Sequence, residues 1–341
     1  MPIPPRNGNP DGVFIDQESL GPRLVLLSGG FGGARLVPHL AEVLGSGQLT
    51  IIANVGDDLT WLGVRICPDV DANLYAMAGL WDSARGWGRA DDTFRTRDAL
   101  GSLGVDPWFG VGDADLALHL LRTELLRAGR TLTEATVELA RRLGVERATV
   151  LPASDEPSET HLRLSDERNV HFQEWYVREG ARPAVRSVYL AGGPASHAAL
   201  AALRDADAVV LGPSNPITSI GAILALSGMG EAVARVPLRI AVSPVVIRVD
   251  ALDDAARPHT LARQRILASE ECLDHPGAIA GRYRGLVNYF VLDWADAEEQ
   301  ADVRSVELQP ILADLLDPVA LAQTLKDLAA PRNRGAASPA R

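Results

Sequence analysis

Residues 24–35 read LVLLSGGFGGAR, a short apolar run followed by two pairs of glycines on either side of Phe31. An apolar run that ends in glycines predicts a buried strand over Leu24–Ser28. Helical periodicity follows from Ala34 to Leu44, and a second apolar run occupies Leu49–Val55. The order strand, glycine loop, helix, strand is typical of the opening of a parallel, doubly wound sheet.

The rest of the chain continues this alternation, so we predict an α/β fold: a doubly wound, mostly parallel, Rossmann-like sheet with a mainly helical insert over about 72–147. Further strands are predicted at His161–Leu164, Val170–Val177, Val185–Ala191, Ala208–Leu211, Leu238–Val242 and Leu286–Leu292. Helices are predicted at Asp71–Trp81, Asp113–Ala128, Leu132–Leu143, Ala195–Arg204, Thr218–Ala234, His259–Ser269 and Val319–Leu328. We expect a flexible leader over 1–22, one folded domain over 23–330 and a flexible tail over 331–341.

Composition excludes several classes of protein. The 341 residues are 47% apolar and 23% charged, which is ordinary for a globular chain with a sizeable core. A net charge of −11 argues against nucleic-acid and anionic-membrane partners. No apolar run approaches the ~18 residues of a membrane span. The N-terminus lacks a secretory signal, so we expect a cytoplasmic protein. Cys67 and Cys272 are far apart, which argues against a disulfide framework or a cysteine zinc site.

The glycine loop between the first strand and the first helix suggests a phosphate site. Glycines let backbone N–H groups approach an anion, and the helix N-terminus adds a favourable dipole. No Gly-Lys-Ser/Thr closes the loop, so it is not a Walker A motif. Arg35 stands where a dinucleotide fingerprint has Gly or Ala, and Asn54 stands where it has an acidic residue, so NAD binding is weakly supported. Tight strand-to-helix packing is the alternative explanation for the glycines.

Four aspartates follow the second strand within 15 residues: Asp57 and Asp58, then Asp69 and Asp71 before a helix. Loops at the carboxyl ends of parallel strands are where open α/β sheets bind ligands. Carboxylate oxygens suit Mg²⁺, which typically takes one or two of them together with substrate phosphates. Aspartate is also a common turn former and helix N-cap, so some of these residues are expected to be structural.

Two further segments are candidates for ligand contacts. The loop Gly212–Gly221, GPSNPITSIG, follows an apolar strand and opens a helix, and its hydroxyl and amide groups suit an anion or a base. Trp87 and the run Trp108–Gly110 gather aromatic side chains in a chain that is only 5% aromatic. Those rings suit a stacked heteroaromatic ligand, or equally the core of a helical subdomain.

The chain resembles the 2-phospho-L-lactate transferase family, which builds the deazaflavin coenzyme F-420. The resemblance runs from about Leu24 to Val246, and no motif extends it further. It is carried, in order, by GGFGGARL, NVGDD, ICPDVDANLY, GWGRADDTF, WFGVGDADLALHLLR, LPASDEPSETHL, HFQEWYV and GPSNPITSIGAIL.

The resemblance implies a Mg²⁺-dependent transferase. Its acceptor would be FO (7,8-didemethyl-8-hydroxy-5-deazariboflavin), whose ribityl hydroxyl attacks the donor. The donor would be a guanylyl diphosphate diester of a three-carbon acid, either 2-phospholactate or phosphoenolpyruvate, and GMP would leave. The sequence does not say which acid is used. A functional link to the guanylyltransferase that makes the donor is implied, and a homodimer is expected.

The resemblance also assigns roles to residues of this chain. The catalytic and metal-binding residues would be Asp57 and Asp71, with Asp58 and Asp69 as alternates. The FO-binding residues would be Asp71, Trp87 and Gly110. The nucleotide would face Gly29, Gly30, Gly32, Gly33, Ser214, Asn215, Pro216 and Thr218. Two other functions remain open: a non-catalytic nucleotide-sugar-binding regulator with the same fold, and an NAD-dependent dehydrogenase.

Overall fold

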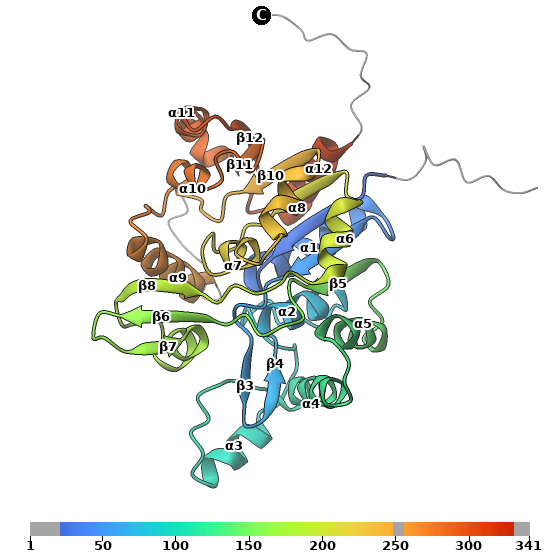
Figure 1. The fold of residues 1–341 in the computed structure, drawn as a ribbon, viewed down its shortest axis with the longest axis vertical. Coiled ribbons are helices and arrows are strands. Elements are labelled where there is room, and N and C mark those ends of the chain that lie inside the picture. The colour runs from blue at the N-terminus through green and yellow to red at the C-terminus, as the bar shows by residue number, and fades with distance from the viewer. Residues whose placement is uncertain (1–20, 248–255, 331–341) are drawn as a thin grey trace, which may run out of the picture.

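The computed structural model of this chain describes residues 21–247 and 256–330. Its centre is a seven-stranded sheet in which every pair of neighbouring strands is parallel (Figure 1). The predicted doubly wound, parallel α/β fold is therefore confirmed. Most of the predicted leader and all of the predicted tail lie outside the described residues. The order across the sheet is β12 (Gln309–Ala313), β11 (Tyr289–Asp293), β10 (Leu238–Val242), β9 (Ala208–Leu211), β1 (Leu24–Ser28), β2 (Leu49–Ala53) and β5 (Ala148–Pro152).

The quoted apolar run forms β1, which is buried along its whole length in the middle of the sheet. Leu24 lies opposite Leu49 of β2 on one side and opposite Ala208 of β9 on the other. A parallel strand that is covered on both faces reads as a nearly continuous apolar run, which explains the absence of alternation in Leu24–Leu27 before the buried Ser28.

Helices cover both faces of the sheet because the chain crosses it in two directions. From β1 through β2 to β5 the strands are added toward one edge of the sheet. The chain then returns to β9 beside β1, and β10, β11 and β12 are added toward the other edge. Because the crossovers between parallel strands are right-handed, the two sets of helices lie on opposite faces. On one face, α1 (Phe31–Leu44) packs against α2 (Pro68–Met77) and the C-terminal α12 (Pro318–Ala329). On the other, α6 (His197–Arg204) packs against α8 (Met229–Arg235).

Between β2 and β5 lies the segment predicted as a helical insert. The hairpin of β3 (Leu59–Trp61) and β4 (Val64–Ile66) and the start of α2 precede the predicted bounds of about 72–147, and α3 (Arg95–Ser102), α4 (Asp113–Arg127) and α5 (Leu132–Arg142) lie within them. The C-terminal half adds α9 (Ala256–Ser269), α10 (Pro276–Arg282), η3 (Trp294–Glu299) and α11 (Gln300–Ser305). None of the helices in the described ranges is long and apolar enough to cross a bilayer.

Three predicted strands belong to a different sheet. β6 (Thr160–Leu164), β7 (Asn169–His171) and β8 (Val185–Leu190) form a separate antiparallel sheet beside the central one. The strand predicted over 170–177 was wrong beyond His171, because the chain turns there into a π-helix, η2 (Glu174–Arg178). Apolar and aromatic residues such as those in this segment suit either conformation, so their pattern did not distinguish them.

Two strands of the central sheet, β5 and β12, were not predicted. Each contains a proline, Pro152 or Pro310, which weakens a strand pattern, and both strands lie at edges of the sheet, where proline is tolerated. The single helix predicted over 218–234 is in fact two, α7 (Ile220–Leu224) and α8, separated by Gly228 in a left-handed conformation with φ of 85°.

A buried ion pair joins α4 to α2, and α2 in turn packs against the central sheet. The Arg122 guanidinium of α4 donates two hydrogen bonds to the Asp71 carboxylate of α2, one of 2.9 Å from Nη1 and a shorter one from Nη2. Arg122 is fully buried. His119 lies 3.4 Å from Asp71 and 3.2 Å from Asp115, and Tyr75 donates to Asp115 at 2.6 Å. α4 is therefore held to α2 by charged groups that have little access to water.

Replacing Arg122 with methionine should lower the free energy of unfolding by about 3–5 kcal/mol, because Asp71 would stay buried but lose both hydrogen bonds from the guanidinium. Denaturant unfolding measures this change. The matched control is Arg127→Met on the same helix, where the side chain is exposed and the expected change is small. Equal stability of the two variants would show that the pair does not hold the insert.

Candidate functional site

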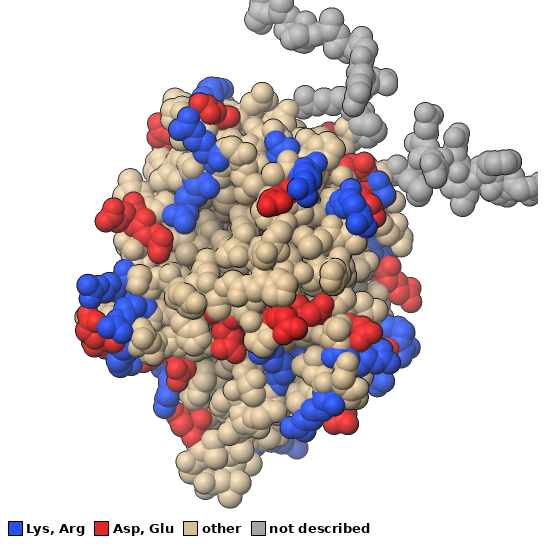
Figure 2. Space-filling model, in the orientation of Figure 1, with Lys and Arg blue, Asp and Glu red and all other residues tan. Residues whose placement is uncertain are grey.

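A cavity of about 1020 Å³ opens at the carboxyl ends of the central strands. Its wall includes Gly30 after β1, Asp57 after β2, Ser214 after β9 and Val245 after β10. β1 and β9 are neighbours whose following helices go to opposite faces, so the cavity lies at the switch point of the sheet, the usual ligand position in this architecture. Figure 2 shows one face of the molecule, on which acidic and basic side chains are interspersed and the basic ones do not gather into a patch.

Two carboxylates meet at one amide in the wall of this cavity. Asn54 Nδ2 donates to Asp57 Oδ1 at 3.0 Å and to Asp69 Oδ2 at 2.9 Å. Gln173 Nε2 donates to the other Asp57 oxygen at 3.2 Å. Both aspartates are 7% exposed.

Burial is the main reason why the pKa values of Asp57 and Asp69 are raised. It raises the pKa of Asp57 well above its ordinary value, and the neighbouring Asp69 charge raises it further. Burial likewise raises the pKa of Asp69 to about 7, although hydrogen bonds from Asn54 and the Gly30 backbone amide oppose the rise. The pair therefore favours either a shared proton or a cation.

The other two predicted aspartates have arginine partners. Asp58 accepts a hydrogen bond from Arg65 at 3.0 Å, and burial still raises its pKa to about 6. Asp71 lines the cavity, but its carboxylate is held by Arg122. Positions two apart on a helix face different sides, so Asp69 and Asp71 do not point the same way from α2. The sequence interpretation paired Asp57 with Asp71, whereas the structure pairs Asp57 with Asp69.

The predicted glycine loop is packed tightly against the loop that follows β9. The Gly29 amide donates to Ser214 Oγ at 3.0 Å. A Cβ added to Gly32 would overlap the Pro213 carbonyl oxygen, and one added to Gly33 would overlap Ser28 Oγ. Gly30 and Gly32 line the cavity. The loop thus combines tight packing with a position at the site, and two of its amides, those of Gly29 and Gly30, already have partners within the protein.

The loop after β9 supplies polar groups to the same wall. Ser214, Asn215 and Thr218 line the cavity, while the Pro216 carbonyl faces Gly221. Asn215 Oδ1 accepts from the backbone amides of Ile217 at 2.9 Å and Thr218 at 3.2 Å, which fixes the turn.

Trp87 and Gly110, predicted to face FO, lie together at the insert side of the cavity. The Trp87 indole lies over Gly110, where an added Cβ would stand 2.8 Å from the ring. The Arg85 guanidinium lies 5.1 Å from the centre of the Trp87 ring and 5.2 Å from that of Phe94. Trp87 is 41% exposed, so its outer surface is available for stacking.

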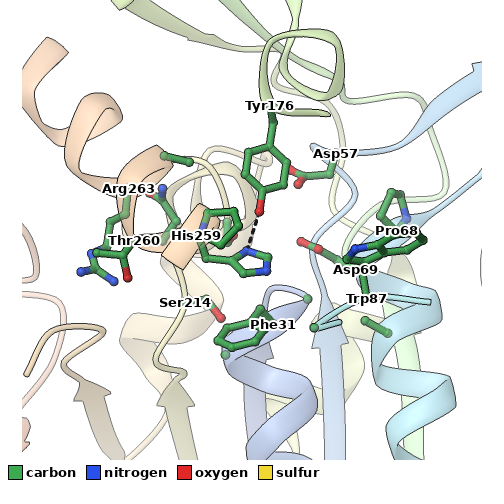
Figure 3. Close-up of a pocket in the computed structure, with 18 of the residues that line it drawn as sticks. Phe31, Asp57, Pro68, Asp69, Trp87, Tyr176, Ser214, His259, Thr260 and Arg263 are labelled. Atoms are coloured by element: carbon green, nitrogen blue, oxygen red, sulfur yellow. Dashed lines mark hydrogen bonds between the residues drawn. The ribbon is translucent and has the colours of Figure 1, made fainter. Parts of the chain in front are cut away.

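Sequence reasoning missed a group of rings in the middle of the cavity: Phe31, Tyr176 and His259 (Figure 3). Phe31 and His259 stack with centroids 4.3 Å apart, and the Tyr176 hydroxyl lies 3.0 Å from His259 Nδ1. Tyr176 belongs to the π-helix that was predicted as a strand, and His259 lies beyond the last motif at Val246. Single π-turns often occur at functional sites, but periodicity does not reveal them.

Comparisons with known proteins agree on one family. The family model of 2-phospho-L-lactate transferase CofD matches residues 24–318. A phosphoenolpyruvate transferase of Mycobacterium marinum is 38% identical over 330 residues, covering 89% of this chain and 97% of that protein. One of Streptomyces griseus is 35% identical over 324 residues, covering 90% and 98%. The crystal structure of a Bacillus halodurans protein described as a member of the upf0052 family aligns with a TM-score of 0.56 at 17% identity, covering 89% and 98%, which shows a shared fold alone.

Gly32→Ala should lower the free energy of unfolding by roughly 1–3 kcal/mol, because the added methyl would overlap the Pro213 carbonyl and force the two loops apart. Thermal or denaturant unfolding provides the measurement. Gly230→Ala is the control: it lies in a helix with its nearest neighbour 3.9 Å away, and alanine there should be neutral or stabilising. If Gly32→Ala is as stable as the control, the loop accommodates a methyl group at position 32 and the close packing against Pro213 is not required.

Asp69→Asn should flatten the dependence of stability on pH. The Asp69 carboxyl loses its proton near pH 3.8 when unfolded and near pH 7 when folded, so the folded state binds an extra proton between these values. Parent stability therefore falls as pH rises from about 4 to 7, by at most on the order of 4 kcal/mol from this group. In thermal unfolding with EDTA, the stability of Asp69→Asn relative to that of the parent should be greatest at pH 8.

The control for this experiment is Asp166→Asn. Asp166 is exposed, and hydrogen bonds from Arg168 lower its pKa, so its substitution should leave the pH profile above about pH 5 unchanged. Parallel profiles for parent and Asp69→Asn would contradict a raised pKa at Asp69.

Proposed function

Because the chain belongs to the 2-phospho-L-lactate transferase CofD family, we propose that it transfers a phospho-three-carbon-acid group from a guanosine-diphosphate-type donor to the ribityl hydroxyl of FO, releasing GMP. This reaction is a step in the biosynthesis of coenzyme F-420. The name shared by the curated relatives favours phosphoenolpyruvate as the acid. The observation that carries the proposal is the buried Asp57–Asp69 pair in the cavity at the switch point.

The donor set of this pair fits Mg²⁺. Two hard carboxylate oxygens converge in the cavity wall, and burial raises the pKa of both groups, so a bound cation would offset the cost of keeping them charged. Asp57 and Asp69 would hold the ion, and the ion would supply charge neutralisation for the donor diphosphate. Asn54 holds both carboxylates in position, and Gln173 orients Asp57 from the opposite side.

We assign the two remaining walls of the cavity to the two substrates, one to the donor and one to FO. The Ser214–Thr218 loop offers directional polar groups for the guanosine diphosphate part, beside Gly30 and Gly32. The half-exposed Trp87 ring, backed by Gly110 and flanked by Arg85, suits the flat deazaflavin ring of FO. At about 1020 Å³ the cavity is at the upper end for a ligand site, as two substrates bound together require.

Catalysis in this proposal rests on position and charge rather than on a covalent intermediate. Transfer of a phosphoryl-linked group needs the acceptor hydroxyl in line with the leaving GMP and neutralisation of the charge that develops. Of the two carboxylates, the one nearer the acceptor hydroxyl would accept its proton.

The purified full-length protein should form the deazaflavin phosphodiester product and GMP when given FO, Mg²⁺ and a donor made from GTP by the partner guanylyltransferase. Phosphoenolpyruvate and 2-phospholactate are compared as the acid, and mass spectrometry identifies the product. Asp57→Asn should lower turnover by about 10²–10³, as for removal of other preorganised electrostatic groups. The control, Asp166→Asn, should retain parent activity.

A second measurement tests the metal without turnover. Mg²⁺ should raise the thermal midpoint of the parent, because an ion that binds only the folded state stabilises it, and should not raise that of Asp57→Asn. The absence of deazaflavin product with either acid would contradict the proposed reaction. A Mg²⁺-induced shift of equal size in both proteins would move the metal away from Asp57.

A further inference from the structure

The wall of the cavity that carries Trp87 also carries two arginines. Arg85 and Arg97 both line the cavity, and Arg97 lies in the first turn of α3. The Arg85 guanidinium lies 5.1 Å from the centre of the Trp87 ring, and the two guanidiniums lie 5.2 Å and 6.0 Å from the centre of the Phe94 ring. Positive charge therefore borders the surface on which a flat ligand would stack.

The two arginines differ in the partners that they already have. Arg85 lies 3.0 Å from an Asp82 carboxylate oxygen and donates to the backbone carbonyl of Arg89. Arg97 donates through Nε to the Pro107 carbonyl oxygen at 3.2 Å. Among the described residues, no acceptor is hydrogen-bonded to its Nη1 or Nη2, and no carboxylate is paired with it. This half-buried guanidinium is therefore able to donate to an anionic ligand in the cavity.

The acidic side chains near this wall have partners within the protein. They are Asp82 beside Arg85, Asp92, which accepts from amides at the start of α4, Asp113, which accepts from amides at the start of α3, and Asp115 beside His119. The other charged side chains of α3, Arg95 and Asp98, are exposed. The positive charge of Arg97 is thus left for a ligand.

The acceptor in the proposed function has an ionisable group on its ring. The 8-hydroxyl of FO is conjugated with the carbonyl groups of the pyrimidine ring, so it is acidic, and the charge of its anion is shared between both ends of the tricycle. When the ring stacks on Trp87 and the ribityl chain is directed toward Asp57 and Asp69, one end of the tricycle faces the arginines. Either end carries part of the charge, so a guanidinium stabilises the anion in both orientations.

We propose that this wall binds the ionised form of FO, with the Arg97 guanidinium donating to an anionic oxygen of the ring, and that Arg97 determines specificity for an 8-hydroxylated deazaflavin. Arg85 adds positive charge beside the same ring. The inference rests on the proposed function, in which FO is the acceptor. It adds a requirement for negative charge that an aromatic wall alone does not impose.

The ionisation of FO on the protein can be followed in its absorption spectrum, because loss of the hydroxyl proton extends the conjugation of the ring. In a spectrophotometric pH titration, FO bound to the parent protein should have a pKa lower than that of free FO by about 1–2, which is a 10- to 100-fold preference for the anion. In Arg97→Gln the pKa of bound FO should rise by about the same amount. Any titration of Asp57 and Asp69 is common to both proteins and cancels in this comparison.

The control is Arg95→Gln, which removes the same charge from the same helical turn but from an exposed side chain outside the cavity. FO bound to this variant should keep the parent pKa. Equal changes in Arg95→Gln and Arg97→Gln, or no change in either, would overturn the role of Arg97. A bound pKa in the parent at or above that of free FO would overturn the inference even if Arg97→Gln failed to fold.

Affinity measured at two pH values separates ligand contact from a merely structural role. Above the pKa of free FO, Arg97→Gln should bind FO about 10- to 100-fold more weakly than the parent, whereas below that pKa, where the ligand is neutral, the loss should be clearly smaller. Losses of equal size at both pH values would show that Arg97 only holds the Pro107 backbone and would overturn the inference.

These outcomes are distinguishable from failure of the proposed function. A parent protein that forms the deazaflavin product but does not lower the pKa of bound FO would overturn the inference and leave the transferase reaction standing. A parent that binds ionised FO through Arg97 but forms no product with either acid would overturn the proposed reaction alone. A parent that does not bind FO would overturn both.

Discussion

Two carboxylates are held together in a place from which water is largely excluded, and the arrangement around the cavity follows from that constraint. Asp57 and Asp69 share the amide of Asn54, and burial keeps the pKa of both above normal. The positive end of α1, through the Gly30 amide, is directed at Asp69. Asn54, which follows β2, contributes two hydrogen bonds to this pair, and the residues just before α1 and the π-helix, Gly30 and Gln173, contribute one each, so segments distant in sequence converge here.

Local sequence patterns predicted the parts of this site that depend on neighbouring residues. The apolar run of β1 and its glycine loop gave the sheet and the cavity's position, because strand, turn and helix are encoded within about twenty residues. They did not give the partner of Asp57. That choice depends on Arg122, which lies 51 residues beyond Asp71 and neutralises its carboxylate. Tyr176 and His259 were not predicted as site residues for the same reason. Neither a π-turn nor a contact between residues 83 positions apart produces a periodic pattern in the local sequence.

The two halves of the chain contribute different chemistry to one cavity. The segment between β2 and β5 supplies carboxylates and the Trp87 ring, whereas the segments after β9 and β10 supply polar loops and α9. α9 itself packs on β8 of the small antiparallel sheet, so that sheet serves as a support for a wall of the site. The family model matches residues 24–318 and so includes the segments on both sides of the cavity.

The loops after β1 and β9 are interlocked, since the Gly29 amide bonds Ser214 and Gly32 fits against the Pro213 carbonyl. Neither loop can shift without carrying the other, so this side of the cavity is rigid before any ligand arrives. Rigid surfaces lose little conformational entropy on binding. The half-exposed Trp87 ring offers a different contribution, because a ligand that covers it removes apolar surface from water. Discrimination between ligands would then depend on the fixed shape of the interlocked loops and on how much of the Trp87 ring each ligand covers.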